Sequence, residues 1–133
     1  MSDSDRYVLV ADDDALVLRS LTFVLERAGF TLRTATTGLE ALAIAKESPP
    51  VLALLDVMMP EMTGLELCRT LKNTRSTAHV PVFLVTARAM VSERARGIAA
   101  GADAYITKPF VNKELIAQVR EVWDSGIGAE TDR

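Results

Sequence analysis

The stretch Tyr7-Val-Leu-Val-Ala-Asp-Asp-Asp14 stands near the start of the sequence and predicts the fold class. An unbroken aliphatic run of this length suits a parallel strand that is buried on both faces. Two more such runs follow, Val51–Leu55 before Asp56 and Val80–Val85 before Thr86. The pattern predicts a buried sheet whose strands end in polar side chains.

Weaker strand patterns and amphipathic helices fill the rest of the chain. Thr31–Thr36 alternates and is more polar, as an edge strand would be, and Ala104–Thr107 is a short strand before Lys108. Apolar residues recur at helical spacing in Val17–Ala28, Leu39–Ala45, Leu65–Leu71, Val91–Ala99 and Leu115–Trp123. The fourth helix contains Gly97, which costs about 1 kcal/mol relative to Ala, so we expect this helix to be the least stable. Five strand–helix units predict one α/β domain with helices on both faces of a parallel sheet.

Composition excludes several function classes. The chain has 133 residues, of which 49% are hydrophobic and 25% charged, and its net charge is −3. This suits one globular domain and gives no basic surface for nucleic acid or anionic membrane. Its single His79 and single Cys68 cannot form an internal disulfide or supply the usual zinc ligands, so a metal site must use oxygen.

The expected location is cytoplasmic. A lone cysteine is typical of a reducing compartment, and residues 1–6 are polar and lack the apolar core of a signal peptide. No apolar run approaches the ~18 residues that span a bilayer. We therefore expect no membrane partner.

Polar residues at the ends of the predicted strands should converge if the first and third strands are neighbours. They are Asp12 and Asp13 after the first strand, Asp56, Thr86 and Lys108. Two unit charges ~4 Å apart repel by about 4 kcal/mol at an effective dielectric near 20, so either a cation binds or pKa values rise. Oxygen ligands suit Mg²⁺, Mn²⁺ or Ca²⁺. With a lysine and a hydroxyl, this set suits the binding of a phosphoryl group.

Four motifs follow one another along the chain: Val8-Leu-Val-Ala-Asp-Asp-Asp14, Leu55-Asp-Val-Met-Met-Pro-Glu-Met-Thr-Gly64, Val85-Thr-Ala87 and Gly101-Ala-Asp-Ala-Tyr-Ile-Thr-Lys-Pro-Phe110. Together they resemble the two-component response regulator receiver domain of the CheY-like superfamily. The resemblance implies a doubly wound (βα)₅ domain, flavodoxin-like, with a parallel sheet of order 2-1-3-4-5. The expected organisation is a polar tail over 1–6, a receiver domain over 7–124, and a tail or linker stub over 125–133.

The resemblance also implies the chemistry of the acidic residues. Asp56 would accept a phosphoryl group from a sensor histidine kinase or a histidine phosphotransfer protein. Asp12, Asp13, Asp56 and the backbone carbonyl of Met58 would hold Mg²⁺, with Mn²⁺ possible in its place. The chain would then be a signalling phosphoacceptor and not an enzyme, with Mg²⁺-dependent self-phosphorylation and autodephosphorylation.

The remaining motif residues would form the switch. Lys108 would pair with the phosphoryl oxygens, and the Lys108–Pro109 bond would be cis. Thr86 would bind the phosphoryl group, and Tyr105 would swing inward as Thr86 moves. This would remodel the face of the fourth helix, fifth strand and fifth helix, which would contact an output protein or domain. Ala104 replaces the acidic residue of family members that form a salt-bridged dimer, so we expect a monomer or weak dimer.

Two other readings stay open at this point. Asp12-Asp-Asp14 offers the D-x-D pattern of haloacid-dehalogenase-like phosphatases, with Asp12 as nucleophile and Asp14 as general acid. Leu16, however, replaces the usual Thr or Val. A flavodoxin-like FMN binder would share the sheet order, but the three aspartates would repel its phosphate.

Overall fold

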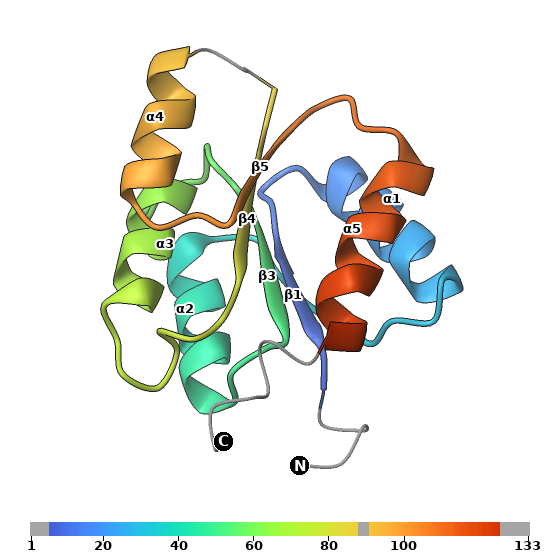
Figure 1. Cartoon of the computed structure of the whole chain (residues 1–133), viewed down its shortest axis with the longest axis horizontal. Coiled ribbons are helices and arrows are strands. Elements are labelled where there is room, and N and C mark those ends of the chain that lie inside the picture. The colour runs from blue at the N-terminus through green and yellow to red at the C-terminus, as the bar shows by residue number, and fades with distance from the viewer. Residues whose placement is uncertain (1–5, 88–90, 126–133) are drawn as a thin grey trace.

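The computed structural model describes residues 6–87 and 91–125, and it contains five strands that alternate with five helices (Figure 1). In chain order they are β1 Val8–Ala11, α1 Ala15–Arg27, β2 Leu32–Ala35, α2 Gly38–Glu47, β3 Leu52–Asp56, α3 Gly64–Lys72, β4 Val82–Thr86, α4 Val91–Ala99, β5 Ala104–Thr107 and α5 Asn112–Ser125. Most of both expected tails, residues 1–5 and 126–133, lies outside the described residues.

All five strands are parallel and lie in one sheet of order β2-β1-β3-β4-β5. The central strand β3 pairs with β1 through Val8 opposite Leu52, and with β4 through Ala53 opposite Val82. The predicted (βα)₅ topology and the edge position of β2 are confirmed. Because β1 and β3 are neighbours, the aspartates that follow or end them meet at the same edge.

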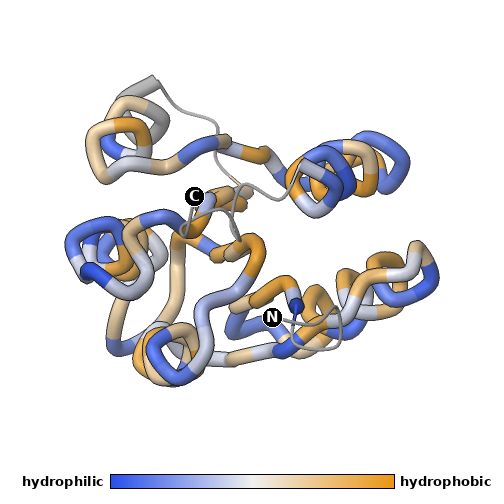
Figure 2. The backbone as a smooth tube through the Cα atoms, turned by 60° about the horizontal axis from the view of Figure 1, so that its bottom comes forward, coloured by the Kyte–Doolittle hydropathy of each residue, from blue (hydrophilic) through white to orange (hydrophobic). Residues whose placement is uncertain are grey.

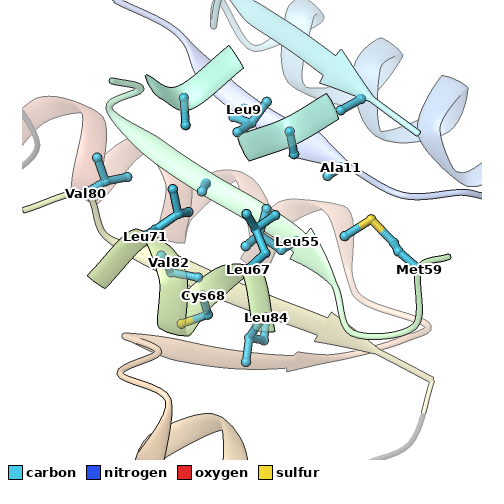
Figure 3. Packing of buried hydrophobic residues seen from close by; sticks show 14 of the residues in the cluster. Leu9, Ala11, Leu55, Met59, Leu67, Cys68, Leu71, Val80, Val82 and Leu84 are labelled. Carbon is cyan, nitrogen blue, oxygen red and sulfur yellow. The ribbon is translucent and has the colours of Figure 1, made fainter. Parts of the chain in front are cut away.

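Alternate residues of each strand point to opposite faces of the sheet, so the core has two parts. One part contains Leu9, Leu55 and Leu84 and packs under α2 and α3 with Leu67 and Cys68 (Figure 3). The other part contains the strand residues that alternate with these, and it packs against α1 and α5, which cover the opposite face of the sheet (Figure 1). In Figure 2 the helices carry both hydrophobic and hydrophilic colours along their length, as expected for helices with one face on a sheet.

Local signals fix where the helices begin and end. The Asp14 carboxylate accepts from the backbone N–H of Leu16 at 2.9 Å, which caps α1. Thr63 and Glu66 form a reciprocal capping box at the start of α3. Gly29, directly after the cap of α1, has φ of +102°, a conformation that glycine adopts without steric penalty. None of the helices in the described part of the chain is long and apolar enough to cross a bilayer.

Candidate functional site

The carboxyl ends of four strands surround one polar cavity of about 420 Å³. Asp12 directly follows β1, Asp56 ends β3, Thr86 ends β4 and Lys108 directly follows β5. The lining residues are Asp12, Asp13, Asp14, Asp56, Met58, Thr86, Ala87 and Lys108. Residues up to 96 positions apart in sequence thus meet at one edge of the sheet.

Three carboxylates lie close enough to share a cation. One oxygen from each of Asp12, Asp13 and Asp56 lies within 4.8 Å of the others. Asp12 is 2% exposed and Asp56 7% exposed, whereas Asp13 faces solvent. Hard oxygen ligands in a half-open cavity suit a divalent cation such as Mg²⁺, which keeps several waters when it binds.

Lys108 supplies positive charge to the buried pair of carboxylates. Its Nζ donates to Asp12 Oδ2 at 2.9 Å and to Asp56 Oδ1 at 3.4 Å. The Lys108–Pro109 peptide bond is cis. One ammonium group therefore bridges the ends of β1 and β3 from β5 and offsets part of the repulsion between the two aspartates.

Burial and neighbouring charges shift two pKa values at the site. Burial, followed by the charge of Asp12, raises the pKa of Asp56 from 3.8 to about 6, although Lys108 opposes the shift. Burial by itself would lower the pKa of Lys108, but its hydrogen bond to Asp12 and the charges of Asp56 and Asp12 outweigh burial, so the pKa is raised. Asp56 thus carries an unfavourable negative charge at neutral pH, which a bound cation would relieve.

Asp12 and Asp14, on either side of Asp13, both have hydrogen-bond partners within the protein. Asp12 accepts at both oxygens, from the backbone N–H of Asp14 at 2.9 Å and from Lys108. Asp14 caps α1 through its own carboxylate. Asp12 is therefore buried and engaged on both sides, and Asp14 is occupied as a helix cap, which suits neither the nucleophile nor the general acid of a D-x-D phosphatase.

Met58, Thr86 and Tyr105 lie at three levels of exposure. Met58 lines the cavity and is 71% exposed, whereas Thr86 is 2% exposed. Tyr105 is half-buried on β5 and packs against the core cluster under α2 and α3. The inward swing predicted for Tyr105 concerns a second state, and it stays a prediction.

Gly97 has a packing role that the sequence did not reveal. A Cβ at Gly97 would lie 2.9 Å from Cδ2 of Tyr105 and 3.1 Å from Cδ1 of Leu84. The glycine thus gives the Tyr105 ring room against α4. The sequence predicts only its low helix propensity, because the side chains that approach it, Tyr105 and Leu84, belong to the strands β5 and β4.

Comparison with known proteins identifies the family of this chain. The family described as response regulator receiver domain matches residues 8–120. Response regulator MprA of Mycobacterium ulcerans is 45% identical over 113 residues, which are 85% of this chain and 48% of that protein. MprA of Mycobacterium leprae is 43% identical over the same length and is covered to 49%. The chain spans about half the length of the curated relatives it matches.

Solved structures share the whole fold. Chemotaxis protein CheY4 of Vibrio cholerae superposes with a TM-score of 0.82 at 29% identity, covering 88% of this chain and 98% of that one. The signal receiver domain of a signal transduction histidine kinase from Syntrophus aciditrophicus gives 0.85 at 30% identity, covering 95% and 96%. With the family match over residues 8–120 and the acidic cavity at the strand ends, these likenesses show that the chain belongs to the response regulator receiver domain family.

Proposed function

We propose that Asp56 is the phosphoacceptor of this signalling domain. Its carboxylate is largely buried, but it lines the half-open cavity beside Lys108. This geometry carries the proposal. An Asp56 oxygen attacks the phosphorus of a phosphohistidine on a partner. The new P–O bond forms as the P–N bond breaks, and the imidazole nitrogen leaves with the bonding electron pair.

Lys108 and Thr86 hold the transferred group. The ammonium of Lys108 is already 3.4 Å from Asp56 Oδ1, so it can pair with phosphoryl oxygens placed on that residue. Thr86 lines the same cavity and provides a hydroxyl donor. The phosphoryl oxygens are additional acceptors that exist only after transfer, so contacts from these two residues would favour the phosphorylated conformer.

A divalent cation fits the same site. The cluster of Asp12, Asp13 and Asp56, with a raised pKa at Asp56, has the composition and charge that suit Mg²⁺ or Mn²⁺. The backbone carbonyl of Met58 is the further ligand that we assign. When bound, the cation would neutralise charge on the transferring phosphoryl oxygens. The protein supplies orientation and the ammonium of Lys108.

The partners follow from this chemistry. The phosphoryl donor is a sensor histidine kinase or a histidine phosphotransfer protein, because the chain's own His79 does not line the cavity. The output contact is the α4-β5-α5 face, where Tyr105 packs beside α4, and it serves a separate protein or domain. We propose residues 7–124 as the receiver unit and a cytoplasmic location, which suits the free, buried Cys68.

Acetyl phosphate labelling tests the assignment. With Mg²⁺, the wild-type protein should gain one phosphoryl mass, and Asp56→Asn should gain none. Asp14→Asn is the matched control, since an asparagine can still cap α1 and the variant keeps Asp56. Labelling that persists in Asp56→Asn, or that maps to Asp12, would overturn the phosphoacceptor role and restore the phosphatase reading.

A further inference from the structure

The loop between β3 and α3, residues 57–63, is held at both ends by glycines. Gly64 begins α3 at the end of the loop, and Gly38 begins α2 beside it. A Cβ on either residue would lie under 3.0 Å from the backbone of the loop or of the residue before it. Such distances are well inside van der Waals contact, so a larger side chain would force the backbone to move.

Gly64 contacts the backbone of the phosphoacceptor itself. A Cβ at Gly64 would lie 2.3 Å from the carbonyl oxygen of Asp56 and 2.9 Å from Cα of Val57. The N–H of Gly64 also donates to the carbonyl of Val57 at 2.9 Å, which closes the loop. The start of α3 is thereby held against the end of β3, and it can be so close only because residue 64 has no side chain.

Gly38 holds the other side of the loop. A Cβ there would lie 2.2 Å from the carbonyl oxygen of Met62 and 2.7 Å from its Cβ. Just before that contact the chain makes a tight turn, in which Met62 N–H donates to the carbonyl of Pro60 at 2.7 Å. The central residue of this γ-turn, Glu61, has φ of +71°, which is a strained conformation for a side chain that is not glycine.

Met58 lies in the middle of this clamped segment. Its neighbours Val57 and Met59 are 5% and 6% exposed and belong to one core cluster, whereas Met58 itself points to the cavity rim. In Figure 3 the side chain of Met59 points from the loop toward Leu55. The Met58 peptide is therefore fixed by a buried side chain on each side and by a glycine contact at each end of the loop.

We propose that Gly38 and Gly64 are positioning residues for the metal site, which hold the Met58 carbonyl and the Asp56 carboxylate at the separation that Mg²⁺ requires. The proposal rests on the proposed function, because it takes Met58 as a ligand. Mg²⁺ demands nearly ideal octahedral geometry, so a displaced loop should weaken its binding. Neither glycine touches the cation, and each acts through the backbone that it contacts.

The test is Mg²⁺ affinity in Gly64→Ala and Gly38→Ala, measured by calorimetric titration at about pH 8, where Asp56 is ionised. We expect affinity to fall by about 10- to 100-fold in Gly64→Ala, as for other losses of support behind a metal ligand, and by less in Gly38→Ala. Gly29→Ala is the matched control. It strains a positive-φ position but has nothing within 4 Å, so it should lower stability and leave Mg²⁺ affinity unchanged.

Amide hydrogen exchange of the wild type is a second test, and it does not depend on whether the variants fold. If the clamp positions the ligand, bound Mg²⁺ must in turn stabilise the clamp, because coupling is reciprocal. Mg²⁺ should therefore slow exchange at the N–H of Gly64. Unchanged exchange there, or unchanged Mg²⁺ affinity in a folded Gly64→Ala variant, overturns the positioning role. A wild type that binds no Mg²⁺ overturns the proposed metal site itself.

Discussion

Replacing Asp56 with asparagine should stabilise the fold at about pH 7.5, and the gain should disappear in acid. Asp56 is 7% exposed and its pKa is raised to about 6, first by burial and then by the charge of Asp12. The folded wild type therefore contains an ionised carboxylate in a place that disfavours it. Asparagine keeps the shape of the side chain and the acceptor for Lys108, and it removes the charge.

The magnitude follows from the pKa values. A carboxyl group whose folded pKa lies above its unfolded value binds its proton more tightly in the folded state, so stability falls as pH rises between the two values. For Asp56 this window runs from 3.8 to about 6. At about 1.4 kcal/mol per unit, the full effect is about 3 kcal/mol, and less than about 1 kcal/mol of it has developed at pH 4. The stability gap between Asp56→Asn and wild type should widen by about 2 to 3 kcal/mol from about pH 4 to about pH 7.5.

The assay is urea or thermal unfolding of both proteins across this pH range without Mg²⁺. A difference of about 3 kcal/mol corresponds to about 10 °C in melting temperature for a domain of this size. Saturating Mg²⁺ should then raise the melting temperature of the wild type more than that of Asp56→Asn, since the proposed cation site includes the ionised carboxylate. A gap that stays constant with pH would refute the reasoning. Asp14→Asn, which removes a charge from the same loop, serves as the control.

Two further predictions concern α4 and the core. Gly97→Ala should displace the Tyr105 ring from α4, because the added Cβ would lie 2.9 Å from Cδ2. The readout is the ring proton shifts of Tyr105, and unchanged shifts would show that the ring does not depend on the glycine. Cys68 is buried and its pKa is raised to about 11 by burial, so its thiol should be unreactive toward Ellman's reagent until the protein is unfolded. Rapid labelling of the native protein would contradict the burial of this thiol.

Much of the fold could be predicted because the local and global signals agree. The aliphatic run of β1 ends at Asp12, and that of β3 ends at Asp56, so the sequence itself predicts the burial and the length of these strands. Asp14 as a cap and Gly29 after α1 are local rules that act over a few residues. The sheet order β2-β1-β3-β4-β5 could not be predicted from such local rules, and only the family resemblance implied it.

The residues that form the candidate site could be predicted from the sequence, but the packing contacts that hold them in place could not. Asp12, Asp56 and Lys108 each lie at the end of a strand, so a parallel sheet with β1 beside β3 brings them to one edge. The contacts of Gly38 with Met62 and of Gly97 with Tyr105 depend on how helices sit on loops and strands. A sequence records a glycine at these positions without recording what approaches it, so steric roles of this kind need coordinates.

The core cluster under α2 and α3 connects the site to Tyr105. Met59, which follows the loop residue at the cavity, and Leu84 of β4 belong to the cluster under α2 and α3, and Tyr105 packs against the same cluster. Val85 and the buried face of α5 belong to the opposite cluster. Because packed interiors transmit displacement through contact, a shift of the loop at Asp56 meets Tyr105 and α4 within a single cluster. The Tyr105 ring packs beside Gly97 of α4, and it has room there because Gly97 has no Cβ. A change in the position of this ring would alter the surface that α4 and β5 present.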